Sequence, residues 1–96
     1  MNIVGIFIKA LPEISGVSDR GEWVRGGLVI ETQGSYPTKI AFTVFGEERV
    51  GAVRTLGVGE LVSVDFSPES REYGGKWYTD LKVAKITPLQ QNQRYP

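Results

Sequence analysis

Cysteine and histidine are both absent from this sequence of 96 residues. Without cysteine, disulfides, thiolate metal sites and cysteine nucleophiles are excluded, and a reducing compartment is permitted. Without histidine, no side chain has an ordinary pKa near neutrality, which argues against zinc chemistry and most hydrolase mechanisms. None of the 12 glycines forms the spacing of a phosphate-binding loop. We therefore expect no catalytic residues, no metal site, no cofactor and no enzymatic activity.

An excess of charge of one sign is also missing, because 11 basic residues balance 11 acidic ones. This removes the simplest argument for nucleic-acid binding, and any polyanion must be met by a local cationic patch. A long hydrophobic run is missing as well. The most apolar segment, residues 3–11, is short and contains Lys9, so it is read as a strand and not as a signal peptide or membrane span. We expect a cytoplasmic protein without a membrane partner.

Alternation of apolar and polar residues indicates five strands in one small domain. The first strand is expected at residues 2–11 and to end at Pro12, with residues 12–21 as a loop. Further strands are expected at residues 22–32, 38–45, 60–67 and 76–86. Gly26 and Gly27 indicate a bulge or tight bend in the second strand. The side chains expected on the core side include Val24, Leu28, Ile30, Ile40, Phe42, Val44, Val62, Val64 and Phe66.

One segment has a different period. In residues 47–56, Val50, Val53 and Leu56 recur about every three residues, with acidic residues first and Arg54 near the end. This pattern predicts a short helix between the third and fourth strands.

The stretch "SREYGGKWYTD" predicts a tight hairpin, because two adjacent glycines suit a two-residue turn with positive φ. The turn at Gly74 and Gly75 sets a register between the last two strands. It places Tyr73 opposite Lys76, Arg71 opposite Tyr78, Phe66 opposite Val83, and Val64 near Lys85. Apolar residues and cationic-aromatic residues then fall on opposite faces. Pro68 is expected to make a bulge.

This order of strands and helix predicts an all-β protein, a five-stranded OB-fold Greek-key barrel with one short helix. The alternative is another small barrel of the SH3-like type, which lacks a helix at this position. The domain is expected to span residues 1–88, and residues 89–96, with two glutamines in succession and no apolar period, are expected to be a short disordered tail.

The segments "ETQGSYPTKIAFTVFG" and "SREYGGKWYTDLKVAKI" resemble a family of small, single-domain bacterial proteins of uncharacterised function, grouped with the single-stranded DNA-binding OB-folds. The layout is more distantly similar to bacterial single-stranded DNA-binding protein and to primosomal replication protein, in which aromatic side chains stack on bases. The resemblance implies such a role for Trp23, Phe45, Tyr73, Trp77 and Tyr78.

The residue types agree with that implication, since exposed rings stack on bases and cations contact phosphates. The expected nucleic-acid-binding residues are Trp23, Arg25, Lys39, Phe45, Arg71, Tyr73, Lys76, Trp77, Tyr78 and Lys82. Some have simpler explanations. Trp77 falls on the apolar face of the hairpin, which favours a cap on the barrel core over ligand contact. Tyr73 and Tyr78 can pair with each other, and Trp23 can lie in a subunit interface.

Two functions therefore follow from the sequence. The first is binding of single-stranded DNA or RNA, with DNA expected, by a homo-oligomer such as a dimer or tetramer. The alternative is a module for protein-protein interaction or oligomerisation that binds no nucleic acid.

Overall fold

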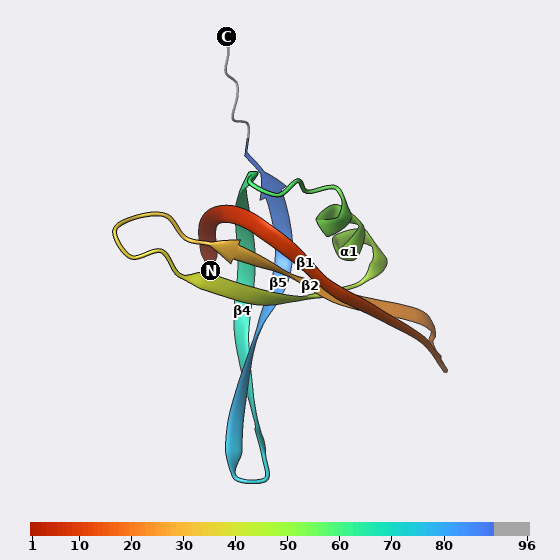
Figure 1. Ribbon diagram of the computed structural model, residues 1–96. Helices are drawn as coiled ribbons and strands as arrows, with labels where there is room; N and C mark the ends of the chain where they lie inside the picture. The colour runs from red at the N-terminus through yellow and green to blue at the C-terminus, as the bar shows by residue number, and fades with distance from the viewer. Residues whose placement is uncertain (90–96) are drawn as a thin grey trace.

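The five strands close into a barrel, as shown by a computed structural model that describes residues 1–89. The elements are β1 (Asn2–Ser18), β2 (Gly21–Glu31), β3 (Lys39–Phe45), α1 (Glu47–Arg54), β4 (Leu61–Tyr73) and β5 (Lys76–Pro88). Their spatial order is β1-β2-β3-β5-β4, and β1 pairs with β4 to complete the circle (Figure 1). The expected OB-fold, with its helix between β3 and β4, is confirmed. The predicted tail from residue 90 onward lies outside the described residues.

The core is apolar throughout and lies inside the barrel. Phe42 is its largest fully buried side chain, and its ring meets that of Phe66 edge-on, with 5.2 Å between the ring centroids. The buried cluster consists of Phe7, Leu28, Ile30, Phe42, Val44, Val50, Val53, Val62, Val64 and Val83. The alternation predicted for β2, β3 and the barrel part of β4 is therefore confirmed.

The helix closes one end of the barrel. Val50 and Val53 of α1 are buried in the core cluster, and Leu56 packs against it from the turn that follows. The helix begins after Gly46, which has a φ of 96°. The burial of Val50 and Val53 agrees with the three-residue period predicted from the sequence.

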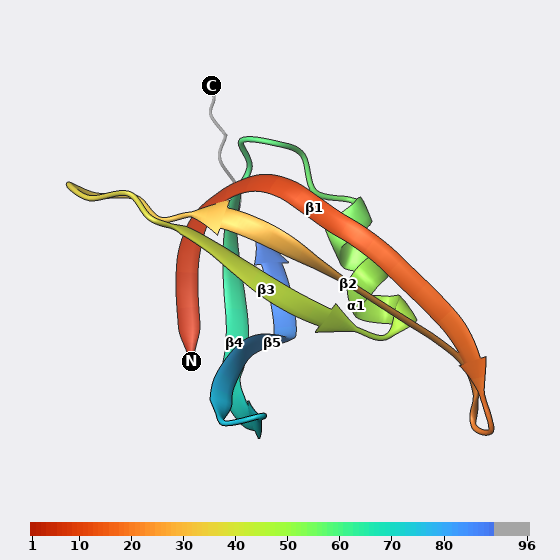
Figure 2. The same ribbon diagram turned by 60° about the horizontal axis from the view of Figure 1, so that its bottom comes forward.

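The first strand is longer than expected, and the prediction of a loop at residues 12–21 is wrong. β1 continues to Ser18 and pairs with β2 as far as Gly21, forming a hairpin arm that projects from the barrel (Figures 1 and 2). The register moves so that Pro12 and Glu13 together oppose Gly26. Pro12 lies in this bulge, where no ladder hydrogen bond from its missing N–H is needed. The bulge expected near Gly26 is present, with its extra residue in β1.

The hairpin between β4 and β5 forms a second arm, and its predicted turn is confirmed. Gly74 and Gly75 have φ values of 59° and 84°. The pairs on the turn side are those expected, namely Tyr73 with Lys76, Arg71 with Tyr78, and Phe66 with Val83.

The prediction of a bulge at Pro68 is wrong. Pro68 pairs regularly, at a point where β4 has a neighbour on one side only and a residue without an N–H is tolerated. The register shift falls just before Phe66, with Ala84 as the extra residue on β5. Val64 therefore lies opposite Ile86, one position beyond the one expected from the turn.

A glycine substitution tests the packing of the strands. A Cβ added at Gly27 would lie 2.5 Å from the backbone oxygen of Phe42, which has little freedom to move. We expect Gly27→Ala to lower the free energy of unfolding in urea by about 1–3 kcal/mol. Gly51 of α1 has no atom within 4 Å of its added Cβ, so Gly51→Ala should raise it by about 0.5–1 kcal/mol. A Gly27→Ala variant as stable as the wild type would contradict this packing.

Candidate nucleic-acid interface

Aromatic and cationic side chains gather on the outer surface of β2, β3 and β5. Trp23 and Arg25 lie on β2, and Arg25 is paired with Phe45 at the end of β3. The ammonium nitrogen of Lys82, on β5, lies 5.4 Å from the centroid of the Phe45 ring. The structure thus brings together four of the side chains that the sequence proposes as binding residues.

The same surface continues along the β4–β5 arm. Arg71 and Tyr73 alternate on β4, and Lys76 and Tyr78 are their partners on β5. Tyr73 is 77% exposed and Tyr78 is 51% exposed. We call the whole surface the aromatic face; its members are Trp23, Arg25, Phe45, Glu69, Arg71, Tyr73, Lys76, Tyr78, Asp80 and Lys82.

Trp77 is not part of this face, and its expected role as a cap on the core is wrong. It lies opposite Glu72 on the other side of the arm and is 68% exposed. Alternation assigns Trp77 to the side of Leu81 and Val83, which do pack at the core. The arm extends beyond the barrel, so at Trp77 there is no core left to cover.

Lys39 is also separate from the other candidates. It begins β3 and pairs with Glu31, whereas Phe45 ends the same strand. Six residues at about 3.3 Å each place the two ends about 20 Å apart. The structure therefore does not bring Lys39 together with the aromatic face.

Two of the cations on the aromatic face are already paired with carboxylates. The guanidinium of Arg71 donates to Asp80 at 3.1 Å, and the ammonium of Lys82 forms an ion pair with Glu69. The hydrogen bond from Lys82, together with its charge, holds the pKa of Glu69 below its ordinary range. Within residues 1–89, Arg25 and Lys76 have no ion pair.

A groove of about 1050 Å³ borders the aromatic face. It was not predicted, because residues 12–21, which include part of its β1 wall, were expected to form a loop. Trp23 and Phe45 line it together with side chains of β1 and α1. Gly16 sets the position of the indole ring, since a Cβ added there would lie 2.6 Å from Cζ2 of Trp23. The ring therefore lies against the backbone of β1, where it is 42% exposed.

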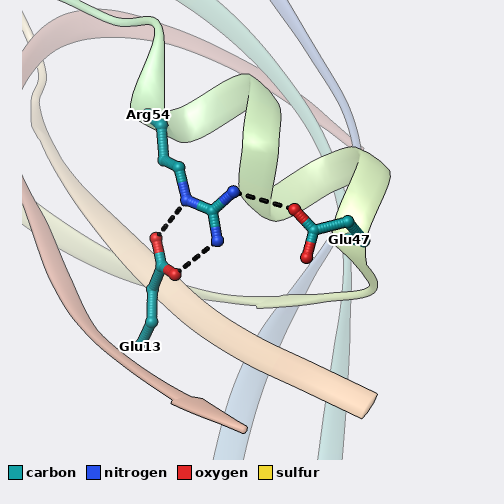
Figure 3. Close-up of polar contacts among 3 residues, drawn as sticks. All are labelled: Glu13, Glu47 and Arg54. Carbon is teal, nitrogen blue, oxygen red and sulfur yellow. Dashed lines mark hydrogen bonds and ion pairs between the residues drawn. The ribbon is translucent and has the colours of Figure 1, made fainter. Parts of the chain in front are cut away.

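Arg54, at the end of α1, connects the helix to the β1 wall of the groove. Its Nε and Nη2 donate to the carboxylate of Glu13 at 2.8 and 2.6 Å, and its Nη1 donates to Glu47 at 2.8 Å (Figure 3). The hydrogen bonds from Arg54 lower the pKa of Glu13, and those to Glu13 and Glu47 raise the pKa of Arg54. This contact joins the β1–β2 arm, which carries Trp23, to the end of α1.

In the part of the chain that the structure describes, no three His, Cys, Asp or Glu side chains are grouped as metal ligands. No helix among those residues has the length and apolar character needed to cross a membrane.

Comparison with known proteins supports the architecture. A family model described as "Domain of unknown function (DUF3127)" matches residues 2–87. No curated protein matches the chain. The mitochondrial single-stranded DNA binding protein Rim1 of S. cerevisiae has a similar structure, with a TM-score of 0.72, 19% identity and 96% of each chain covered. The small single-stranded DNA-binding protein from Streptomyces coelicolor has a TM-score of 0.51 and 15% identity, with 92% of this chain and 91% of that chain covered. At these identities the likeness is one of fold.

The contact between Glu13 and Arg54 predicts a pH-dependent stability. Because the folded pKa of Glu13 is lowered, its contribution is present above the ordinary glutamate range and is lost as the pH falls through the folded pKa. We expect Glu13→Gln to lower the melting temperature at pH 7, measured by circular dichroism, with a difference that shrinks in acid. Glu48→Gln is the control, since Glu48 is exposed and has no ion pair within residues 1–89. A Glu13→Gln difference that is the same at every pH would contradict the assignment.

Proposed function

The chain belongs to the DUF3127 family, and we propose that it binds single-stranded nucleic acid, DNA in the first place, with little sequence preference. Bases stack on the exposed rings of the aromatic face, and its cations contact the phosphates between them. Strand faces and the β4–β5 hairpin are the surfaces with which OB-folds bind oligonucleotides. The names of the two similar structures, both single-stranded DNA-binding proteins, support DNA as the ligand.

The observation that carries this proposal is the grouping of rings and cations on one face of three strands and one arm. Arg25 lies beside Phe45, the ammonium of Lys82 approaches the same ring, and Tyr78 follows on β5. Each ring that stacks on a base contributes about 1–3 kcal/mol, so three rings suffice for useful affinity. The exposure of these side chains leaves their faces available to a ligand.

The balanced charge of the chain favours stacking as the main source of affinity. Phosphate neutralisation dominates when a protein carries a large positive charge, and this one has a net charge of zero. The bases of a duplex stack on one another and are not offered to a flat protein surface. A single strand, whose bases can turn outward, is therefore the ligand that suits the aromatic face.

Self-association into a dimer or tetramer is the second candidate, and it is compatible with the first. The exposed apolar side chains of Ile14 and Val17 favour it, because they lie on the same β1–β2 arm as Trp23. In this case the rings of the aromatic face would pack against a second copy of the chain and not against bases.

Substitution of single rings tests the proposal. We expect Phe45→Leu and Tyr78→Leu each to raise the Kd for a single-stranded oligonucleotide by about tenfold or more, which is about 1.4 kcal/mol of lost stacking. The Kd is measured by tryptophan fluorescence at several salt concentrations. Tyr36→Leu is the matched control, since Tyr36 is 90% exposed and belongs to the β2–β3 loop. This loop projects from the opposite side of the barrel from the β1–β2 arm (Figure 1).

A wild-type protein that binds no oligonucleotide at low salt would contradict the proposal, as would equal effects of all three substitutions. Light scattering on the same variants separates the two candidates. A changed molar mass together with an unchanged Kd would favour self-association.

A further inference from the structure

Two carboxylates occupy the middle of the aromatic face. Glu69 on β4 and Asp80 on β5 lie directly opposite each other, between the barrel part of the face and the ring of Tyr78. Like charges at directly opposed positions destabilise a strand pair. Their presence at the centre of a surface suited to a polyanion therefore calls for an explanation.

Each carboxylate is held by a cation two positions further along the opposite strand. Asp80 accepts from Arg71, whose direct partner is Tyr78, and Glu69 pairs with Lys82, two residues beyond Asp80. The four charges thus form two parallel diagonals on one side of the arm. The charge of Arg71 also helps to lower the pKa of Glu69, which agrees with this close arrangement.

The ion pairs contribute little to the stability of the arm, because all four side chains are substantially exposed to solvent. Their effect on a ligand is larger. A phosphate that contacts Arg71 or Lys82 competes with the paired carboxylate and remains close to its negative charge. The rings of the arm are therefore open to a ligand, whereas phosphate contact with Arg71 and Lys82 is opposed by the neighbouring carboxylates.

We propose that Glu69 and Asp80 are specificity-determining residues that select single strands over duplexes, an inference that rests on the proposed function. A duplex presents a rigid row of phosphates and no free base faces, so nothing compensates for the two carboxylates. A single strand stacks its bases on the rings, and its flexible backbone can place phosphates at Arg25 and Lys76, which have no ion pair within the described residues.

The double variant Glu69→Gln/Asp80→Asn tests this inference, since it removes both charges and keeps the size of the side chains. Fluorescence anisotropy of a labelled oligothymidine and of a duplex of equal length gives both affinities for the intact protein. We expect the duplex affinity to rise about tenfold and the single-strand affinity to rise by no more than about threefold. The slope of log K against log salt for the duplex should steepen by about 1.8, as two further phosphates are neutralised.

Glu72→Gln is the matched control, because Glu72 lies on the same arm but on its other side, opposite Trp77. It should leave both affinities unchanged. A urea denaturation curve that matches the wild type shows that the double variant is folded.

Three outcomes would overturn the inference, and they are distinguishable. A wild type that binds the single strand, with an unchanged preference in the double variant, overturns the role of the carboxylates alone. So does a wild type that binds duplex as tightly as single strand. A wild type that binds neither overturns the proposed function as well.

Discussion

Closure of the sheet is the constraint on which the rest of the structure depends. β1 must pair with β4 through Asn2–Ile6 and with β2 through the rest of its length, so it has to bend sharply. Gly5 permits the bend, because a Cβ there would lie 2.8 Å from the backbone oxygen of Glu31. A bulge at Ile8, between Phe7 and Lys9, shifts the register within the β1–β2 pair. Once closed, the barrel has one apolar interior and one outer surface that is available for binding.

The arms follow from strands that are longer than the core they enclose. β4 and β5 have 13 residues each, and only their barrel ends find apolar neighbours. Beyond that point the side chains of both faces meet solvent, so rings such as Tyr73 stay exposed because nothing is left to cover them. A flexible single strand can follow this extended surface, whereas a compact ligand would need an enclosed pocket.

Much of the barrel was predictable because burial has a simple period in strands and in helices. The inner residues of β2 and β3, the buried side of α1 and the Gly74 turn all follow from local sequence. Pro12 was misleading, since a proline usually ends a strand and here lies in a bulge that only the pairing partner reveals. Trp77 was misassigned because alternation gives the side of a strand and not the distance to the core.

The aromatic face was predictable in its residue types and less so in its ion pairs. The ion pairs of Arg71 and Lys82 depend on diagonal neighbours across the hairpin, and those follow from the register only when the whole face is considered. Lys39 has the right chemistry, but the length of β3 separates it from Phe45. Spacing along a strand thus decides which cations can serve one ligand.

The most direct test of this account is a two-dimensional NMR titration of nitrogen-labelled protein with oligothymidine. The account predicts that the chemical shifts of the backbone amides of Arg25, Phe45 and Tyr78 change together and reach saturation at the same oligothymidine concentration. The exposed side of α1, at Glu48, should stay unchanged. Shifts confined to α1 or to the β2–β3 loop, or no shifts at low salt, would contradict it.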